Sequence, residues 1–234
     1  GLGLFALLMF SLFVSASIFA LLAAIAAWLA VRELAVPLLA GQSARMSALL
    51  QVSAVAIVIS GYNGGAEWLV GSFGLAVLAL MMVRLVEGQV GYLNYITHGV
   101  FVLTYAPLLV GFAAVMAGDA NGPWKVMSFV LLTAGADLGA YIAGVRWGRT
   151  PLVPTISPKK TREGLYGALA LNAVVGMTVF ATVLDGRWWQ GLLASLLFTA
   201  GAVVGDLVES MVKRDLGLKD MSNFLPGHGG VMDR

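Results

Sequence analysis

Long apolar runs separated by short polar stretches follow one another along the chain. An apolar stretch over residues 2–31 comes first, and further runs cover about residues 47–60, 69–86, 99–117, 124–145, 165–184 and 189–212. A helix that crosses a bilayer needs about 20 apolar residues, so we expect two closely connected segments in the first stretch, the second ending at Arg32 and Glu33. The pattern predicts an all-α fold, a polytopic transmembrane helix bundle of roughly eight spans.

The composition agrees with a membrane protein. Hydrophobic residues make up 59% of the chain and charged residues 11%. A soluble globular protein does not contain so much apolar surface, so we predict a single integral-membrane domain. The chain has no cysteine, which excludes disulfides and thiolate metal sites. It begins at Gly1 and stops at Arg234 among charged residues, which indicates a fragment with a truncated C-terminus.

Basic residues are divided unequally between the two sides that alternating spans define. Of the 14 lysines and arginines, only Lys125 and Arg187 fall on one side. Because lysine and arginine in short loops favour the cytoplasm, the opposite side is predicted to be cytoplasmic. That side includes the loop over residues 146–163 and the charged C-terminal segment. Attraction to anionic lipid is an alternative explanation for the basic residues near the N-terminal spans.

Charged residues and glycines are concentrated in residues 206–234. Carboxylates at the end of a membrane helix suit a divalent cation, lysine and arginine suit phosphate, and glycines allow a backbone to approach a ligand closely. The loop Pro226-Gly227-His228-Gly229-Gly230 lies within this segment. We therefore expect a membrane enzyme that handles a phosphorylated, metal-bound substrate.

Four polar residues share one face of the last predicted helix: Asp206, Glu209, Ser210 and Lys213, at positions i, i+3, i+4 and i+7. An ionisable group at membrane depth costs roughly 2.5 kcal/mol or more, so a functional or paired role is expected. For Glu209 and Lys213 the alternative is a structural salt bridge. Asp206 has no basic residue at i+3 or i+4, which favours a functional role.

The helix predicted over residues 124–145 repeats this pattern with Asp137, Tyr141 and Gly144. Small residues beside them permit close helix contact. Asp137 is therefore expected to line the same polar cavity as Asp206, where it holds a metal-bound water or orients Tyr141. A simple interhelical hydrogen bond is the alternative.

The predicted cytoplasmic loop contains the run Ser157-Pro158-Lys159-Lys160-Thr161. Basic side chains, two hydroxyls and a helix start after Pro158 together predict a phosphate site, because free backbone amides at a helix start favour an anion. The alternative is a loop whose charges only set the topology.

These motifs together resemble the signature of the phosphatidate cytidylyltransferases, also called CDP-diacylglycerol synthases. The resemblance rests on Ser210-Met211-Val212-Lys213-Arg214, Lys219-Asp220, Ser222, Leu225-Pro226, His228-Gly229-Gly230-Val231 and Asp233-Arg234, and upstream on Ser157 to Thr161, Glu163-Gly164, Asp137, Tyr141 and Gly144. Residues 1–120 are similar only in being apolar and polytopic, so we expect N-terminal membrane helices there and the catalytic part in residues 121–234. Arg162 stands where many members have Trp, and the chain ends before an expected Asp and a closing membrane helix.

The resemblance implies that CTP and phosphatidic acid react to CDP-diacylglycerol and pyrophosphate, with magnesium required and a second cation left open. It implies metal ligands at Asp206 and Asp233, supported by Asp137 and Asp220. It implies phosphate contacts for Lys213 and Arg214, and His228 as a pyrophosphate ligand or an acid. Because Lys213 and Arg214 continue the acidic face of the last helix, we expect them nearest the reacting phosphates. The remaining substrate contacts that it implies are Ser157, Lys159, Lys160, Thr161, Ser210, Lys219, Gly229, Gly230, Arg234 and Tyr141, with the lysine pair on a more distant phosphate or the lipid headgroup.

Other functions fit parts of the same pattern. A polyprenol-type kinase or an ether-lipid phosphate cytidylyltransferase would use similar groups, and an ion-coupled transporter would also place Asp137 and Asp206 in the membrane. The transporter leaves the Lys-Arg and His-Gly-Gly cluster unexplained. No nucleic-acid motif is visible, so no nucleic-acid partner is expected. We expect a bacterial inner-membrane protein whose site faces the cytoplasm. A homodimer is one of the oligomeric states that the sequence leaves open.

Overall fold

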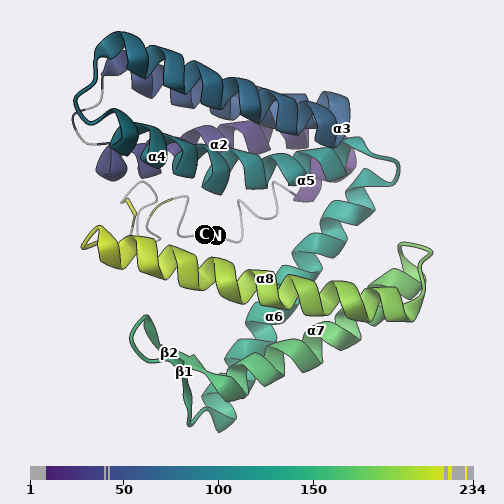
Figure 1. The fold of residues 1–234 in the computed structure, drawn as a ribbon. Coiled ribbons are helices and arrows are strands. Elements are labelled where there is room, and N and C mark those ends of the chain that lie inside the picture. Colours follow the sequence, from purple (N-terminus) through teal and green to yellow (C-terminus); the bar gives the residue numbers. More distant parts are fainter. Residues whose placement is uncertain (1–8, 40, 42, 219–220, 223–229, 231–234) are drawn as a thin grey trace. The chain divides into compact units, whose positions relative to one another are not determined.

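The chain forms two compact units of apolar helices. The structure, a computed structural model, describes residues 9–39, 41, 43–218, 221–222 and 230. One unit, called unit 1 here, comprises Gly1–Pro123 with Lys219–Arg234, and unit 2 comprises Trp124–Leu218. Within the described residues, six helices are long and apolar enough to cross a membrane (Figure 1). The prediction of an all-α, polytopic integral membrane protein is therefore confirmed.

Each unit is built from a few long elements. Unit 1 contains α2 (Ala16–Leu38), α3 (Ala44–Glu87), α4 (Tyr92–Leu103), the π-helical η1 (Thr104–Leu108) and α5 (Leu109–Gly118). Unit 2 contains α6 (Gly122–Trp147) from Trp124 onward, β1 (Pro151–Val153), β2 (Ser157–Thr161), α7 (Arg162–Thr182) and α8 (Trp188–Asp215). The helices of unit 2 match the three spans predicted there to within a few residues.

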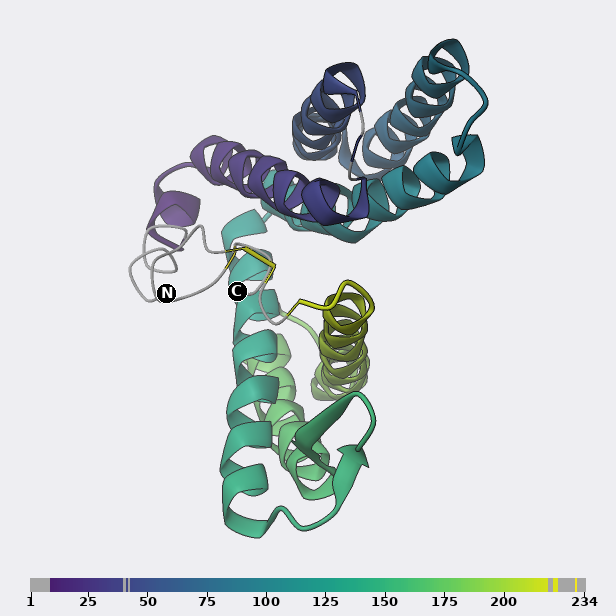
Figure 2. The ribbon, with the colours of Figure 1, turned by 90° about the vertical axis from the view of Figure 1, so that its left-hand side faces the viewer.

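Helix α3 folds back on itself at Gly65. Its 44 residues would measure about 66 Å if straight, roughly twice the thickness of a bilayer core. Gly65 has φ 70° and ψ −161°, a conformation open to glycine, and the two arms on either side of it lie side by side (Figures 1 and 2). The predicted spans over residues 47–60 and 69–86 are these two arms. One of the six long helices therefore holds two of the predicted passes.

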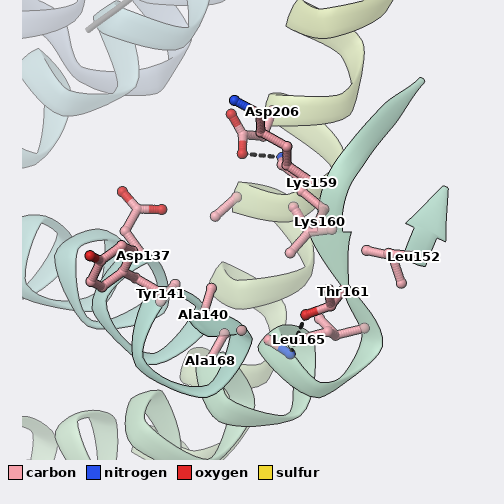
Figure 3. Close-up of a pocket in the computed structure, with 15 residues that line it drawn as sticks. Asp137, Ala140, Tyr141, Leu152, Lys159, Lys160, Thr161, Leu165, Ala168 and Asp206 are labelled. Carbon is pink, nitrogen blue, oxygen red and sulfur yellow. Dashed lines mark hydrogen bonds and ion pairs between the residues drawn. The ribbon is translucent and has the colours of Figure 1, made fainter. Parts of the chain in front are cut away.

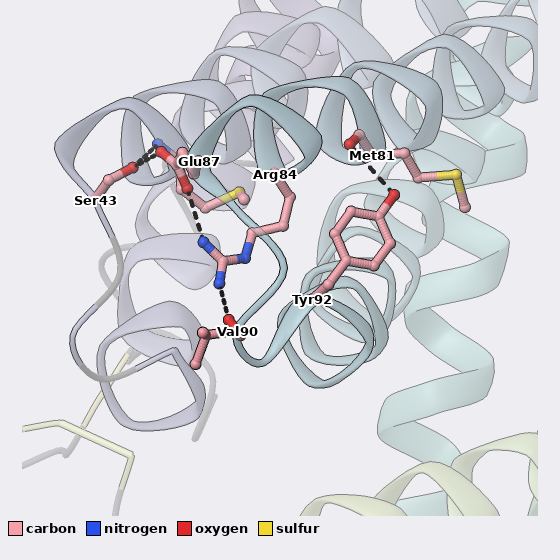
Figure 4. A network of polar contacts seen from close by, with 7 residues as sticks. Ser43, Met81, Arg84, Glu87, Val90 and Tyr92 are labelled. Carbon is pink, nitrogen blue, oxygen red and sulfur yellow. Dashed lines mark hydrogen bonds and ion pairs between the residues drawn. The ribbon is translucent and has the colours of Figure 1, made fainter.

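Polar contacts join the two ends of α3 (Figure 4). The Ser43 hydroxyl donates to the Glu87 carboxylate, and Arg84 lies 3.4 Å from the same carboxylate. The Arg84 guanidinium also donates to the Val90 carbonyl and stacks 4.4 Å from the ring centroid of Tyr95. These contacts pair the Glu87 carboxylate and the two terminal nitrogens of Arg84 where the arms return to one end of unit 1, while Arg84 Nε is buried without a hydrogen-bond partner.

The first apolar stretch differs from its prediction at its end. The chain is helical at residues 9–14, breaks at Ser15, which has extended backbone angles, and continues as α2 to Leu38. The predicted second segment should have ended at Arg32 and Glu33, and this was wrong. Arg32 is exposed on the helix surface while Glu33 is only 9% exposed. Both charged residues are accommodated inside the helix, so they do not terminate it.

Glycines bring the helices of unit 2 into backbone contact. A methyl group at Gly139 on α6 would lie 2.5 Å from the Gly167 carbonyl oxygen on α7. Gly176 on α7 would meet the Gly191 carbonyl on α8 at the same distance. The buried Asn172 amide donates to the Thr199 hydroxyl at 2.8 Å and thereby ties α7 to α8. Small residues and interhelical hydrogen bonds replace the hydrophobic effect as the source of helix association in lipid.

The loop between α6 and α7 forms a β-hairpin that the sequence did not predict. Strands β1 and β2 pair antiparallel, with Pro151 opposite Thr161. Helix α7 begins only at Arg162, where the Thr161 hydroxyl caps it by accepting the Gly164 N–H at 3.1 Å. The expected helix start after Pro158 thus lies at Arg162, with the strand β2 in between. A two-stranded sheet has only edge strands, and these tolerate a proline that lacks an N–H.

We expect Gly167→Ala to destabilise unit 2, because the new methyl group would lie 2.3 Å from the Ala143 Cβ and 2.5 Å from the Gly139 carbonyl oxygen. Overpacking of this kind costs about 1–3 kcal/mol. Gly201→Ala is the matched control, because no described atom lies within 4 Å of the added methyl group. Thermal unfolding in detergent should show a lower midpoint for Gly167→Ala alone. Equal midpoints would contradict the close contact of α6 with α7.

Candidate functional site

A pocket of about 210 Å³ in unit 2 collects residues from three separate parts of the sequence. Helix α6 contributes Asp137 and Tyr141, the end of β2 contributes two lysines and a threonine, and α8 contributes Asp206 (Figure 3). The predicted site residues that line it are Asp137, Tyr141, Lys159, Lys160, Thr161 and Asp206. The expectation that Asp137 and Asp206 share one polar cavity is met by this arrangement.

Lys160 and Asp206 form an ion pair in this pocket. The Lys160 side chain is 27% exposed and that of Asp206 is 55% exposed. An exposed pair of this kind contributes only about 0–1 kcal/mol to stability, so the pair matters chiefly for where it places charge. A cationic nitrogen and a carboxylate lie side by side on the pocket wall. The sequence offered Asp206 no partner on its own helix, and the hairpin supplies one from 46 residues away.

Contacts at the base of the hairpin hold Lys160 in place. The Glu163 carboxylate accepts the backbone N–H groups of Arg149 and Thr150, both at 3.2 Å. A methyl group at Gly164 would come within 3.0 Å of the Ala140 carbonyl oxygen, so α7 starts in direct contact with α6. The strand that bears Lys160 is therefore anchored at the junction of two helices. Sequence reasoning used Glu163 only as part of a motif, although an acid in a first helical turn is a recognisable anchor signal.

The polar face of α8 beyond Asp206 is internally paired. Lys213 Nζ lies 2.6 Å from Glu209 Oε1, which is the salt bridge that their spacing allows. The Ser210 hydroxyl donates to the Asp206 carbonyl at 2.8 Å. Among the described residues that line the pocket, neither Lys213 nor Arg214 is present. The structure thus brings Lys160 to Asp206, whereas the sequence led us to expect Lys213 and Arg214 nearest the chemistry.

The remaining predicted site residues lie elsewhere in the chain. Ser157 begins β2 but does not line the pocket. Gly230 lies in unit 1, against Glu33 of α2. Six predicted residues fall outside the described part of the structure, and their assignments stay predictions: Lys219, Asp220, His228, Gly229, Asp233 and Arg234.

The pocket provides part of a ligand set for a hard cation. Asp137 and Asp206 supply carboxylate oxygens, the ligand type that magnesium prefers. Within the described residues, no group of three or more histidine, cysteine or acidic side chains is arranged to hold a metal. Magnesium commonly takes only one or two carboxylates and completes its shell with water and substrate phosphates. Two carboxylates that line one pocket, one of them paired with Lys160, are compatible with a magnesium that shares its ligands with a phosphorylated substrate.

Comparison with known proteins gives the family. The sequence matches the profile of the Cytidylyltransferase family over residues 1–234. A phosphatidate cytidylyltransferase of Mycobacterium bovis is 44% identical over 144 residues, which are 61% of this chain and 47% of that protein. Phosphatidate cytidylyltransferases of Mycobacterium leprae and Pseudomonas aeruginosa are 39% and 42% identical, over 69% and 49% of this chain and 57% and 42% of their own lengths. The chain thus spans about half the length of these curated relatives, and by its match along the whole sequence it belongs to the cytidylyltransferase family.

Proposed function

We propose that this protein transfers the cytidylyl group of CTP to phosphatidic acid. A phosphate oxygen of the lipid attacks the α-phosphorus of CTP, a new P–O bond forms, and the bond to the β-phosphate breaks. The products are CDP-diacylglycerol and pyrophosphate. The observation that carries the proposal is the pocket in which Asp137, Asp206 and Lys160 meet, in a chain of this family.

The charges in the pocket suit this reaction. Two polyanions repel each other as they approach, and a cationic donor such as Lys160 offsets this repulsion where charge develops. Lys159 and Thr161 also line the pocket and add a second cation and a hydroxyl. At about 210 Å³ the pocket is smaller than the roughly 300–1,000 Å³ typical of sites that enclose a whole small molecule. We therefore assign it to phosphate groups, with the base and the acyl chains outside it.

Magnesium is part of the proposal. Asp206 and Asp137 would hold it, and Asp233 stays a sequence-based candidate ligand. When bound, the cation would neutralise phosphate charge and stabilise the negative charge on the departing pyrophosphate. The protein groups do the rest: Lys160 donates to phosphate oxygens, and the capped start of α7 fixes the strand that presents it. Whether a second cation binds is a question for titration.

The proposed setting is the bacterial inner membrane, with the pocket open to the cytoplasm, where CTP is found. Support comes from the basic residues at one end of unit 2. The end of α6, the hairpin, the start of α7 and the C-terminal end of α8 contain seven lysines and arginines, namely Arg146, Arg149, Lys159, Lys160, Arg162, Lys213 and Arg214. The turn between α7 and α8 has only Arg187. This asymmetry follows the positive-inside rule.

Membranes that contain the protein should convert α-labelled CTP and phosphatidic acid into a labelled lipid, with release of pyrophosphate and dependence on magnesium. CTP labelled at the γ-phosphate should leave the lipid unlabelled. Thin-layer chromatography of parallel reactions with phosphatidic acid, an ether-lipid phosphate and a polyprenol identifies the acceptor. Transfer of the γ-label to the polyprenol would instead identify a kinase.

Asp206→Asn should lower turnover by about 100-fold or more, because it removes the pocket carboxylate that faces Lys160 and the proposed cation. Folding should be retained, since the exposed ion pair adds little stability. Asp215→Asn, at the exposed end of the same helix, is the matched control and should behave like the unsubstituted protein. Activity is measured as initial rates with purified protein whose thermal midpoint is unchanged. A fully active Asp206→Asn variant would remove Asp206 from the site.

Lys160→Gln should reduce kcat/KM more than Lys213→Gln does. Lys160 lies in the pocket beside Asp206, whereas Lys213 is engaged by Glu209. Loss of one charged donor to a transition-state phosphate costs about 100-fold, and we expect a smaller effect from Lys213. Steady-state kinetics with each substrate varied in turn makes the comparison. A larger loss for Lys213→Gln would favour the sequence-based assignment over the one from the structure.

A further inference from the structure

A buried carboxylate in the N-terminal helices contacts the C-terminal segment. Glu33 lies on α2, in unit 1, and is 9% exposed, while its neighbour Arg32 is exposed. The Ser222 hydroxyl donates a hydrogen bond to Glu33 Oε1 at 2.7 Å, although the two residues are 189 positions apart. Met221, next to Ser222, is 7% exposed. Met221 and Ser222 are thus packed into unit 1.

A second point of the same segment meets the same carboxylate. A methyl group at Gly230 would lie 2.5 Å from Glu33 Oε2 and 2.9 Å from the Ser222 hydroxyl oxygen. Ser222 and Gly230 therefore converge on Glu33 from two places in the sequence. Between them the sequence contains His228, and Asp233 follows shortly after. Only a glycine leaves room for this approach, because a larger residue would displace the carboxylate.

The position of Glu33 is costly for α2 itself. An ionisable side chain inside an apolar helix costs roughly 2.5 kcal/mol or more at membrane depth. An apolar residue of similar volume would fill the same space without that cost and often with better stability. Glu33 therefore contributes something that packing alone does not require. Its carboxylate gives the C-terminal segment a fixed polar partner.

We propose that Glu33 is a positioning residue that docks the C-terminal segment on unit 1 through Ser222 and the space left by Gly230. This inference rests on the proposed function, because Ser222 and Gly230 both belong to the signature on which the family resemblance rests. Glu33 itself touches no substrate. It holds two signature residues, Ser222 and Gly230, at one carboxylate, and so lowers the entropy that catalysis would otherwise have to overcome.

The kinetic test uses variants of the whole chain. Glu33→Ala should lower kcat about tenfold or more, the effect expected for loss of a hydrogen bond to a carboxylate, while Glu33→Gln keeps an acceptor oxygen and should stay within about threefold. Ser222→Ala alone should lower kcat, but it should lower kcat little further in the Glu33→Ala background, because the effects of substitutions at two contacting residues are not additive. Additive losses, or a Glu33→Gln variant as inactive as Glu33→Ala, would overturn the proposal.

A labelling test reads the docking without any substrate. The chain has no cysteine, so Met221→Cys introduces a single thiol at a buried position. A maleimide should react with it slowly in the unsubstituted background and about tenfold faster with Glu33→Ala, because the segment then opens more often. Val90→Cys, at an 84% exposed site, is the control for reagent access and should label equally in both backgrounds. Glu67→Ala removes another carboxylate of unit 1, near the bend of α3, and should leave the thiol at position 221 protected.

Unchanged labelling at position 221 in Glu33→Ala would overturn the docking, whatever the activity. Because this measurement needs no CTP, it gives its answer even where no cytidylyl transfer is found. If the proposed function is wrong, the unsubstituted protein will already fail to transfer the cytidylyl group, whatever the labelling shows. A fall in kcat together with faster labelling in Glu33→Ala, restored by Glu33→Gln, supports the proposal.

Discussion

Backbone contact between α6 and α7 is the constraint on which the pocket depends. Gly139 and Gly167 allow the two helices to touch, and Gly164 repeats the contact one turn away from the hairpin. In lipid there is no hydrophobic gain from bringing helices together, so close packing must do this work. The contact fixes the end of α6 next to the start of α7. The contact thereby restricts the position of the hairpin that joins the two helices, from which Lys160 reaches Asp206.

Opposite charges in one pocket suit the proposed phosphate chemistry. Asp206 and Asp137 offer oxygens to a cation, and Lys160 offers a donor to an anion. A magnesium–nucleotide complex has both kinds of charge, and its recognition needs both kinds of partner. Membership of the cytidylyltransferase family gives this arrangement its chemical meaning. In the proposed transfer to phosphatidic acid, the carboxylates bind the cation and Lys160 binds phosphate oxygens.

The N-terminal helices gain a role through Glu33. The family profile covers these apolar helices as well as the rest of the chain, and a purely structural role would be their simplest interpretation. The hydrogen bond from Ser222 and the close approach of Gly230 link α2 to the segment that contains the rest of the signature. According to the proposal, helix α2 of unit 1 positions that segment through Glu33. The buried charge is explained by its partner, as buried charges in apolar helices usually are.

The helical class, most of the spans and the residues of interest could be predicted from the sequence, because apolar run length, i, i+4 spacing and clustered charges are local properties. Asp137 and Asp206 were identified from their helical spacing, and Lys160 from a basic cluster in a loop. The pairing of Lys160 with Asp206 became visible only in the folded chain, since this contact spans 46 residues and depends on an unpredicted hairpin, whereas Lys213 pairs with Glu209 on its own helix. The fold of α3 into two arms was anticipated by its run lengths, but the turn at Gly65 needed coordinates. Glu33 was read as a helix end, because nothing in the local pattern shows that a serine 189 residues away supplies its partner.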